Sequence, residues 1–534
     1  MTDPTRVLCL GGGYVAAYLV KALKAAIQDG RVQVMIVDRN NFHTFHGLIA
    51  EMLACKIQPG QIISPARRLF APADFHNAEI NAIDIEQQIV TTRRRLDGRE
   101  YVLPYDHLVI GLGSMDDLSR YPGIAQHSFR LKSYWDCFRI RNHILKMMEL
   151  ASIEEDPEER RRLLSFVIAG GNYAGVEVAS ELEEFLHALA RQHYRLLNPN
   201  ELRITLVHSG EHLLPELAER YPRLARYATR FLEGLKIQIR YRCRVAAATP
   251  IEVVLNDGTR LSTRTIISCV GNAQSPLLDS LPGERDERGR VKTNELARLP
   301  GHNNLWAGGD CAAIPHPLGG TCPPLAIYAM TAGRQIGRNI LRTLENRPLE
   351  RYTFTGLGDA CSLGHRRAVG HLKGIQLTGL PAWLVWRCFM LIYLPTWERR
   401  IRALLDWLTW PWIGRDIVSI EPDRTLGLEE ALYEPGQTII QQGEVGTALY
   451  VIQSGTVILS QEAPSGERIL GTLSDGGHFG EVAVFENRQR TATVRAQTRV
   501  RLIVIRQDTA QLLSGKVCDF HRILNLPHVV QVRE

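Results

Sequence analysis

The first residues of the chain have the types and spacing needed to bind a dinucleotide. Gly11, Gly13 and Ala16 follow an apolar segment and open an amphipathic one, in the spacing GxGxxA. In such a turn the first glycine permits a tight bend and the second lets the backbone approach a pyrophosphate, while the following helix offers free N–H groups. A second apolar segment ends at Asp38, an acid suited to a ribose hydroxyl. These residues predict a dinucleotide site built on a strand, a turn and a helix.

The same pattern recurs near residue 170. Gly170 and Gly175 hold the outer positions, but Asn172 replaces the middle glycine. The next apolar segment ends at His208 and Ser209, where an acid would favour NADH. The residues predict a second dinucleotide pocket and leave NADH and NADPH open. The alternative is a doubly wound domain that keeps its shape without a ligand.

Residues 479–494, FGEVAVFENRQRTATV, contain a third candidate phosphate site. Short β-type segments separated by glycines precede it, which indicates a small β-barrel or β-roll. This stretch resembles the phosphate cassette of the cyclic nucleotide-binding fold. The resemblance implies that the turn at Phe479 and Gly480 holds a cyclic phosphate, that Glu481 accepts from the ribose 2′-hydroxyl, and that Arg490 pairs with the phosphate. Thr491 would accompany cGMP preference, and cAMP stays open.

Three further segments fall in the order found in two-dinucleotide flavoproteins. Residues 105–114 and 265–276 resemble the strands that link the two domains of that superfamily, and residues 302–317 resemble its late Gly-Asp segment. The resemblance implies that the first glycine turn, Asp38 and Asp310 bind FAD, and that the second glycine turn binds NAD(P)H.

A finer resemblance, over about residues 5–420, is to type II NADH dehydrogenases, the single-chain NADH:quinone oxidoreductases. DRNNFHTFHGLIAEMLACKIQPGQIISPARRLF and the stretch 358–386 support it. It implies hydride transfer from NAD(P)H to FAD and then two electrons to a quinone, with Glu177 as a catalytic residue beside the nicotinamide. Glu177 could instead be an ordinary first-turn acid. Ile327 and Thr331 replace glutamines that line the family's quinone entry, so another small electron acceptor stays open.

Two other classes of flavoprotein and one class without turnover compete with this interpretation. Flavin disulfide reductases need a close cysteine pair after the first helix, where Cys55 stands alone. Sulfide:quinone reductases stay open because sequence does not place Cys137, Cys311 and Cys322 relative to a flavin. Asn172, His208 and the missing glutamines leave room for a redox or cyclic nucleotide sensor or scaffold.

A tryptophan-rich segment follows the flavoprotein-like region. Six of the eight tryptophans fall between residues 383 and 412, and arginines such as Arg387 and Arg402 lie among them. The uncharged run 388–397 is far short of the ~20 residues that span a bilayer. We expect residues 382–412 to bind a membrane surface peripherally, with rings and guanidinium groups at headgroup depth. The alternative is a helix pair packed on protein, and the family resemblance also implies a homodimer.

Composition sets the remaining expectations. The 534 residues, with 45% hydrophobic and 22% charged side chains, indicate several folded domains. A net charge of +6 gives no case for a nucleic acid partner. The ten cysteines form no CxxC pair, so we expect no disulfide framework and no metal site, and the absence of an apolar leader favours a cytoplasmic protein on the inner face of the cell membrane.

The predicted fold class is α/β, with two Rossmann-like domains, a short amphipathic helical segment and a C-terminal β-roll. The predicted boundaries are 1–160 and 291–375 for the FAD domain, 161–290 for the NAD(P) domain, 376–422 for the membrane segment and 423–534 for the cyclic nucleotide-binding domain.

Overall fold

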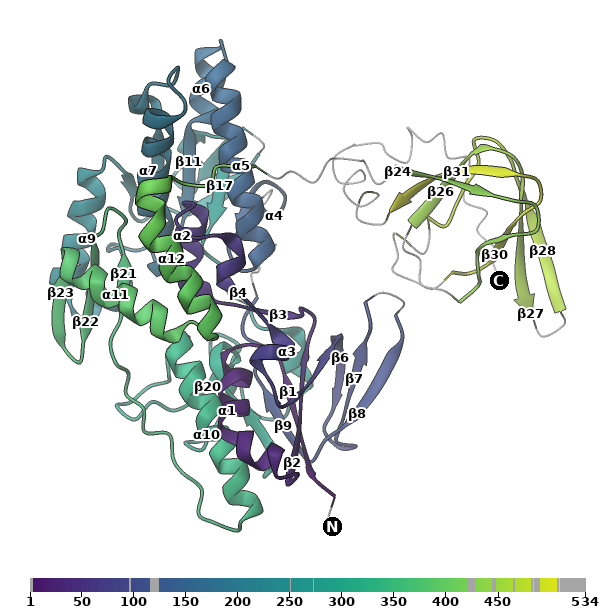
Figure 1. The fold of residues 1–534 in the computed structure, drawn as a ribbon, viewed down its shortest axis with the longest axis horizontal. Helices are drawn as coiled ribbons and strands as arrows, with labels where there is room; N and C mark the ends of the chain where they lie inside the picture. Colours follow the sequence, from purple (N-terminus) through teal and green to yellow (C-terminus); the bar gives the residue numbers. More distant parts are fainter. Residues whose placement is uncertain are drawn as a thin grey trace. The chain divides into compact units, whose positions relative to one another are not determined.

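A computed structural model gives the fold (Figure 1). It describes residues 3–95, 98–115, 124–249, 251–271, 273–419, 428–443, 448–463, 466–481, 484, 490–506 and 509. The predicted boundary at residue 423, and residues 482–483 and 485–489 of the phosphate cassette, lie outside the described residues. The chain forms two compact units, one of residues 1–93 with 100–419 and one of residues 94–99 with 420–534.

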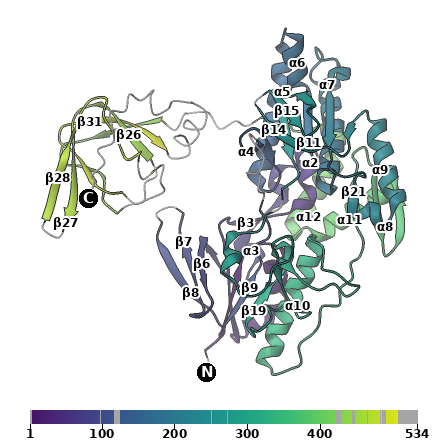
Figure 2. The ribbon, with the colours of Figure 1, turned by 180° about the vertical axis from the view of Figure 1, so that it is seen from behind.

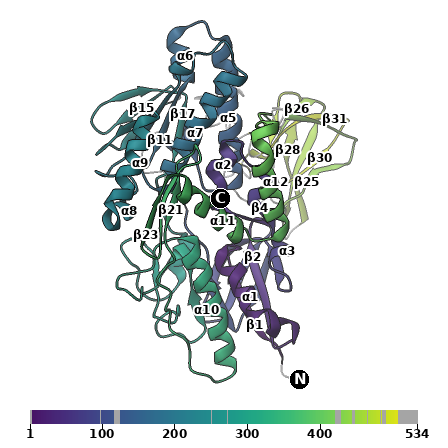
Figure 3. The same cartoon turned by 60° about the vertical axis from the view of Figure 1, so that its left-hand side comes forward.

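The first sheet of the larger unit has five parallel strands in the order β19-β9-β1-β2-β5. Their bounds are β1 (Thr5–Leu10), β2 (Val32–Asp38), β5 (Asp74–Asn77), β9 (His107–Ile110) and β19 (Leu305–Ala307). Helices α1 (Tyr14–Gln28) and α10 (Ala326–Leu344) lie side by side against it (Figures 1 and 3). They touch through Gly333, where a Cβ atom would lie 2.3 Å from the carbonyl oxygen of Val15.

The second sheet also has five parallel strands, in the order β10-β17-β11-β12-β13. Their bounds are β10 (Phe129–Arg130), β11 (Ser165–Ala169), β12 (Arg203–Val207), β13 (Gln238–Arg240) and β17 (Thr265–Ser268). Alternate residues of β11 serve two cores: Phe166 and Ile168 pack with residues of α5 (Tyr134–Ile153) and α7 (Tyr173–Gln192), whereas Val167 packs toward the small sheet β14-β15-β16. Figure 2 shows β14 and β15 beside β11.

The second sheet begins earlier in the chain than the predicted start at residue 161. Strand β10 and helix α5 both belong with it, although they precede the second glycine turn. A two-residue strand has no periodicity that sequence could show, which explains the difference.

The remaining elements of the larger unit are short connections and small sheets. The strands are β3 (Phe42–Thr44), β4 (Ile63–Pro65), β6 (Glu79–Asp84), β7 (Ile89–Arg93), β8 (Glu100–Pro104), β14 (Val245–Ala248), β15 (Glu252–Leu255), β16 (Arg260–Ser262), β18 (Val291–Lys292), β20 (Ala312–Ala313), β21 (Ala360–Ser362), β22 (Ala368–Leu372) and β23 (Ile375–Thr378). The helices are α2 (Ile49–Leu53), α3 (Ala66–Leu69), α4 (Ile124–His127), α6 (Pro157–Leu163), α8 (Pro215–Arg220) and α9 (Pro222–Gly234), with 3₁₀ turns η1 (His46–Leu48), η2 (Pro59–Ile62), η3 (Pro199–Glu201), η4 (Pro276–Ser280) and η5 (Gly309–Cys311).

The tryptophan-rich segment forms two helices, α11 (Gly379–Tyr393) and α12 (Trp397–Ile413). Trp386 is buried at 2% exposure and Ala403 is fully buried, so these residues face the body of the unit. Trp397 and Trp412 are 68% and 89% exposed, so the helices also present an apolar outer face. Among the residues that the structure describes, no helix is both long and apolar enough to cross a membrane.

Two side chains of this segment differ from the expectation of a lipid-facing role. Trp386 lies in the core, and Arg387 is buried and pairs with Glu51 at 2.7 Å, instead of reaching a headgroup. The Arg387 guanidinium also lies 4.0 Å from the centre of the Trp407 ring. Burial of a charge requires a partner, and sequence spacing did not show that Glu51 would supply it.

The C-terminal unit consists of two four-stranded antiparallel sheets, β24-β31-β26-β29 and β25-β30-β27-β28. The bounds are β24 (Leu428–Tyr433), β25 (Thr438–Ile440), β26 (Ala448–Ser454), β27 (Val457–Ala463), β28 (Gly466–Leu473), β29 (His478–Phe479), β30 (Thr493–Ala496) and β31 (Val500–Arg506). Ile452, Val457 and Leu502 are among the buried residues of its core. The predicted α/β fold with parallel sheets and a C-terminal β-type unit is confirmed.

Candidate dinucleotide and cyclic nucleotide sites

The first glycine turn lies between β1 and α1, at the C-terminal edge of the first sheet. Gly11 has φ 99°, and a Cβ atom there would lie 2.3 Å from the carbonyl oxygen of Gly111. At Gly13 a Cβ atom would meet nothing within 4 Å, so the turn is open on that side. Ala16 is fully buried beneath it. The turn can therefore accept a phosphate at the helix N-terminus.

Asp38 ends β2 and holds the same turn from the side. Its Oδ2 accepts from the Gly12 N–H at 2.7 Å, and its Oδ1 accepts from the Asn40 N–H at 2.7 Å. Burial raises the pKa of Asp38, while these two N–H groups favour its ionised form. Each carboxylate oxygen keeps acceptor capacity for a ribose hydroxyl.

Asp310 lies in η5, directly after β19. Its Oδ2 accepts from the Ser114 hydroxyl at 3.2 Å, and the Lys132 ammonium donates to that hydroxyl at 2.9 Å. The preceding Gly309 has φ 76° and packs on Val15 of α1. A Cβ atom at Gly309 would lie 3.3 Å from the Val15 Cγ2 atom. The ends of β1, β2, β9 and β19 thus bring together the residues predicted for FAD, and the open glycine turn fits a pyrophosphate.

The second glycine turn lies between β11 and α7. Gly170 has φ 114°, and a Cβ atom at Gly175 would lie 1.8 Å from the Gly170 carbonyl oxygen. Asn172 has φ −79° and therefore needs no glycine. Its side-chain oxygen accepts from the Gly175 N–H at 3.0 Å, and its amide donates to the Cys269 carbonyl at 2.9 Å. Asn172 is thus the N-cap of α7, a role that asparagine favours.

His208 occupies the position that Asp38 has in the first sheet. The Gly171 N–H donates to its Nδ1 at 3.2 Å, and its Nε2 lies 2.8 Å from the His212 carbonyl oxygen. Because Nδ1 accepts, Nε2 carries the proton and donates, so the imidazole is neutral. Burial lowers the pKa of His208, which agrees with that state.

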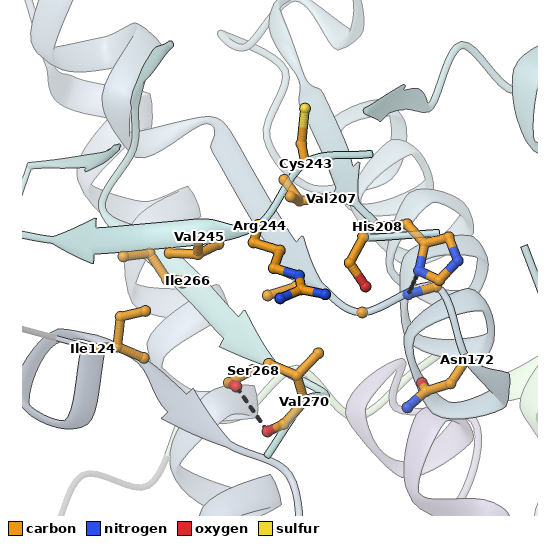
Figure 4. A pocket seen from close by; sticks show the side chains of 14 residues that line it. Ile124, Asn172, Val207, His208, Cys243, Arg244, Val245, Ile266, Ser268 and Val270 are labelled. Atoms are coloured by element: carbon orange, nitrogen blue, oxygen red, sulfur yellow. Dashed lines mark hydrogen bonds between the residues drawn. The ribbon is translucent and has the colours of Figure 1, made fainter. Parts of the chain in front are cut away.

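A pocket of about 280 Å³ opens at this edge of the second sheet (Figure 4). The second glycine turn and the ends of β12 and β17 line it, together with Cys243, Arg244 and Val245. Arg244 is exposed and extends into the middle of the lining residues in Figure 4. Arg244 is not among the site residues predicted from the sequence, because no motif marks the loop that carries it.

Glu177 lies in the second turn of α7, against β21. Its Oε1 accepts from the Ser362 N–H at 3.1 Å. Burial raises the pKa of Glu177 to about 8, and the carboxylates of Glu181 and Glu51 add to the rise. Glu177 is therefore protonated at neutral pH, about one helical turn beyond the second glycine turn.

A group of buried charges continues from Glu177 toward the tryptophan-rich helices. The Lys56 ammonium lies 2.6 Å from Glu181 and 2.7 Å from Glu184, and Arg415 lies 2.8 Å from Glu184. The Ser362 hydroxyl donates to Glu181 at 3.2 Å, and the Ser362 N–H donates to Glu177. Ser362 therefore links Glu177 to this group of charges. The group is not predictable from local sequence patterns, because its members come from distant segments of the chain.

The residues that replace the family's glutamines lie at the start of α10. Thr331 is bonded internally, since its hydroxyl lies 3.0 Å from the Ile327 carbonyl oxygen and 2.5 Å from the Tyr352 hydroxyl. The side chain of Thr331 therefore uses its hydrogen-bonding groups within the protein.

The cysteines left open by sequence are buried. Cys137 and Cys311 are fully buried and Cys322 is 5% exposed. Burial raises the pKa of Cys311 and of Cys322 to about 11, and it raises the pKa of Cys137 further. All three are therefore thiols at neutral pH, and a thiol is a poor nucleophile compared with a thiolate.

In the C-terminal unit, Arg490 and the turn at Gly480 form one bonded structure. The Arg490 guanidinium donates to the carbonyl oxygens of Gly480 at 2.7 Å and Ala448 at 2.6 Å. Gly480 has φ 90°, and the preceding Phe479 is buried and stacks on Tyr450, with ring centres 5.1 Å apart. Arg490, 6% exposed, is thus fixed beside the turn before any ligand binds.

Glu481 follows this turn with an unsatisfied acceptor. Its Oε2 is buried and has no hydrogen-bond partner within the described residues. A buried carboxylate oxygen without a donor is costly, and a ligand hydroxyl would supply one. Thr491 is exposed, and its carbonyl oxygen accepts from Gln461 at 3.4 Å.

Two glycine turns at the strand ends of two parallel sheets are the arrangement typical of two-dinucleotide oxidoreductases. A family model described as pyridine nucleotide-disulphide oxidoreductase matches residues 5–333, and a second model, for the cyclic nucleotide-binding domain, matches residues 430–514. The first match covers more than half of the sequence. The chain belongs to the pyridine nucleotide-disulphide oxidoreductase family.

Several known proteins are similar to this chain. "Type II NADH:quinone oxidoreductase NdhA" of Mycobacterium tuberculosis is 27% identical over 75% of this chain and 86% of its own length. "Demethylphylloquinone reductase NdbB" of Synechocystis is 27% identical over 77% and 98%. The structure of NDH2 from Plasmodium falciparum in complex with NADH has a TM-score of 0.70 at 16% identity and covers 78% of this chain and 99% of that chain. The predicted resemblances to type II NADH dehydrogenases and to the cyclic nucleotide-binding fold are confirmed.

Glu177 should make stability depend on pH. Between pH 4.5, its ordinary pKa, and about 8, the folded protein keeps the proton that the unfolded chain releases, so wild-type stability falls as pH rises through this window. Glu177→Gln cannot ionise and escapes this loss. Its free energy of unfolding in urea, relative to wild type, should therefore rise by at least about 1 kcal/mol from pH 5.5 to 7.5.

The control is Glu219→Gln, which removes a carboxylate from an exposed position of α8. Its stability relative to wild type should change little over the same pH range. If Glu177→Gln and Glu219→Gln show the same pH dependence, then Glu177 is ionised in the folded protein.

Proposed function

We propose that the protein is an FAD-dependent NAD(P)H oxidoreductase of the NADH:quinone type, regulated by a cyclic nucleotide. The observation that supports this most directly is the pair of glycine turns at the C-terminal edges of two parallel sheets, with Asp38 and Asp310 gathered at the first and Glu177 about one helical turn beyond the second. FAD, when bound, supplies two-electron transfer between a nicotinamide and an acceptor.

The protein groups in this proposal bind and orient. The α1 and α7 N-termini hold the two pyrophosphates, Asp38 holds a ribose, and Asp310 is kept in place by the Ser114 hydroxyl. Glu177 keeps a proton at the nicotinamide end of α7, where Ser362 fixes its carboxyl group.

We infer a quinone as the acceptor, because relatives named for quinone reduction align with most of the chain. The sulfide:quinone alternative would use cysteines, and burial keeps Cys137, Cys311 and Cys322 as thiols. The hydroxyl of Thr331 and the apolar Ile327 replace two amides at the start of α10, which favours a quinone held by apolar contacts over one held by side-chain amides.

We propose that the outer face of α11 and α12 binds a membrane surface. Its exposed apolar residues include Leu384, Ile392, Trp397, Leu408 and Trp412. Exposed Arg402 lies on the same helix pair, and the chain has a net charge of +6, which suits an anionic lipid surface. A second copy of the chain, in a homodimer, is the other occupant that the experiment below distinguishes.

We propose that the C-terminal unit binds cAMP or cGMP. Arg490 is held beside the turn by backbone carbonyls, and the unsatisfied Glu481 oxygen awaits a hydroxyl donor. An arginine gives a cyclic phosphate a charge-assisted contact. Regulation requires the nucleotide to favour one of two states of the enzyme, typically by about 1–3 kcal/mol.

The oxidoreductase proposal predicts a yellow protein whose colour fades under anaerobic conditions when NADH or NADPH is added. A stopped-flow experiment at the flavin absorbance measures this directly. Subsequent addition of a short-chain quinone should restore the absorbance, whereas a disulfide should not. A protein that takes up no flavin on reconstitution, or whose flavin neither cofactor reduces, would rule the proposal out.

The membrane proposal predicts that the triple variant Ile392→Ser, Trp397→Ser and Trp412→Ser loses binding to phosphatidylglycerol-containing liposomes. These side chains are 62%, 68% and 89% exposed. Burying each in the interface contributes up to about 1.5–3 kcal/mol, so the partition coefficient should fall at least about tenfold in a flotation assay.

A matched control replaces Ile153, Leu196 and Leu318, which are exposed on other elements, by serine. This control should bind liposomes as wild type does. If wild type does not bind liposomes but the first triple variant turns a dimer into a monomer in light scattering, the face is a contact between copies and the membrane proposal is wrong.

The regulatory proposal predicts micromolar binding of cAMP or cGMP in calorimetry. Arg490→Ala should abolish the binding and Glu481→Gln should weaken it about tenfold, while the flavin spectrum stays unchanged. Arg495→Gln, at an exposed arginine of β30 that pairs with Glu467, is the control and should bind normally. If neither nucleotide gives heat with the wild-type protein, the unit has no regulatory ligand of this class.

A further inference from the structure

The pocket at the second glycine turn combines apolar walls with one polar side. Its walls include the apolar residues Ile124, Val245, Ile266 and Val270, which suit an adenine ring. The ends of β12 and of the loop before β14 contribute His208, Ser209 and Arg244. The end of the second strand is where a dinucleotide-binding domain reads the 2′-position of the adenosine ribose.

His208 changes what this position can accept. An ionised acid there would hydrogen-bond two free ribose hydroxyls and repel a 2′-phosphate. The neutral imidazole of His208 carries no negative charge, and its two nitrogens are already engaged by Gly171 and His212. His208 thus still accepts the hydrogen bond from the Gly171 N–H of the turn, but it lacks the negative charge with which an acid would repel a 2′-phosphate.

Arg244 adds a positive charge to the same pocket. Its backbone N–H donates to the Asn256 side chain at 2.7 Å, which fixes the base of the side chain. Within the described residues, its guanidinium has no ion pair, and the pocket lining contains no carboxylate. The adjacent Arg242 instead pairs with Glu211 at 2.8 Å. A free guanidinium that points into a nucleotide pocket without acids fits a phosphate dianion.

We infer that the second site selects a 2′-phosphorylated nicotinamide dinucleotide, NADPH over NADH, with Arg244 as the phosphate ligand and the Ser209 hydroxyl as its partner. This inference rests on the proposed function only in that the pocket binds a nicotinamide cofactor. It assigns the choice of cofactor to residues outside the glycine turn.

Calorimetry of the full chain with NADP⁺ and NAD⁺ tests this selection, because binding of the oxidised cofactors requires neither flavin reduction nor an acceptor. Wild type should bind NADP⁺ at least about tenfold more tightly than NAD⁺. Arg244→Gln should weaken NADP⁺ binding about tenfold and change NAD⁺ binding less than twofold. The matched control, Arg242→Gln, removes the neighbouring cation and should alter neither.

His208→Glu provides a second, independent variant. Glutamate can still accept from the Gly171 N–H, as Asp38 accepts from Gly12, so the turn keeps its support. This variant should weaken NADP⁺ binding at least about tenfold, whereas NAD⁺ binding should be unchanged or stronger.

Tighter binding of NAD⁺ than of NADP⁺ by the wild-type protein overturns the inference. An equal loss of both cofactors in Arg244→Gln also overturns it, because Arg244 would then contact the shared adenine. If neither cofactor binds, the proposed function fails as well, whereas tight NAD⁺ binding alone would leave it standing.

Discussion

A balanced group of buried charges holds the larger unit together. Three cations, Lys56, Arg387 and Arg415, face three carboxylates, Glu51, Glu181 and Glu184, in pairs of 2.6–2.8 Å. Removing one member of such a group leaves a buried charge without its partner, at a cost of about 3–5 kcal/mol. The pairs connect α2 and α7 to α11 and to the chain just after α12. The inner side of the tryptophan-rich segment is therefore fixed to both dinucleotide domains, and its outer apolar side is left exposed.

The two glycine turns share one geometry and differ in chemistry. In each sheet the residue that ends the second strand accepts a hydrogen bond from a glycine N–H of the turn, Asp38 from Gly12 and His208 from Gly171. The support for the backbone is therefore the same, whereas the charge offered to a ribose differs by one unit. Fold and cofactor choice are thus separable: the acceptor preserves the turn, and its charge selects the ligand.

Sequence predicted the parts of the sites that depend on local pattern. The glycine turns, the strand-end residues and the Gly-Asp segment follow from spacing along one strand and one helix, and the structure gathers Gly11, Asp38 and Asp310 at one sheet edge. Contacts between distant segments were not predictable in this way. Glu51 and Arg387 meet across the fold, and which tryptophans face inward depends on that contact, because an amphipathic pattern does not tell a core from a lipid surface.

The departures from the dinucleotide fingerprint also bear on whether the protein is an enzyme or a sensor without turnover. Hydrogen bonds within the turn preserve the fold whether or not a ligand binds, so the evidence for binding comes from the pocket beside the turn. Asn172 caps α7 through Gly175 and is held by Cys269, while His208 uses both ring nitrogens. Each replacement thus restores the hydrogen bonds of the position that it occupies, and the pocket between them remains open at about 280 Å³. An open pocket into which the Arg244 side chain extends favours a site that still binds a dinucleotide, with a changed preference, over one that only preserves a fold.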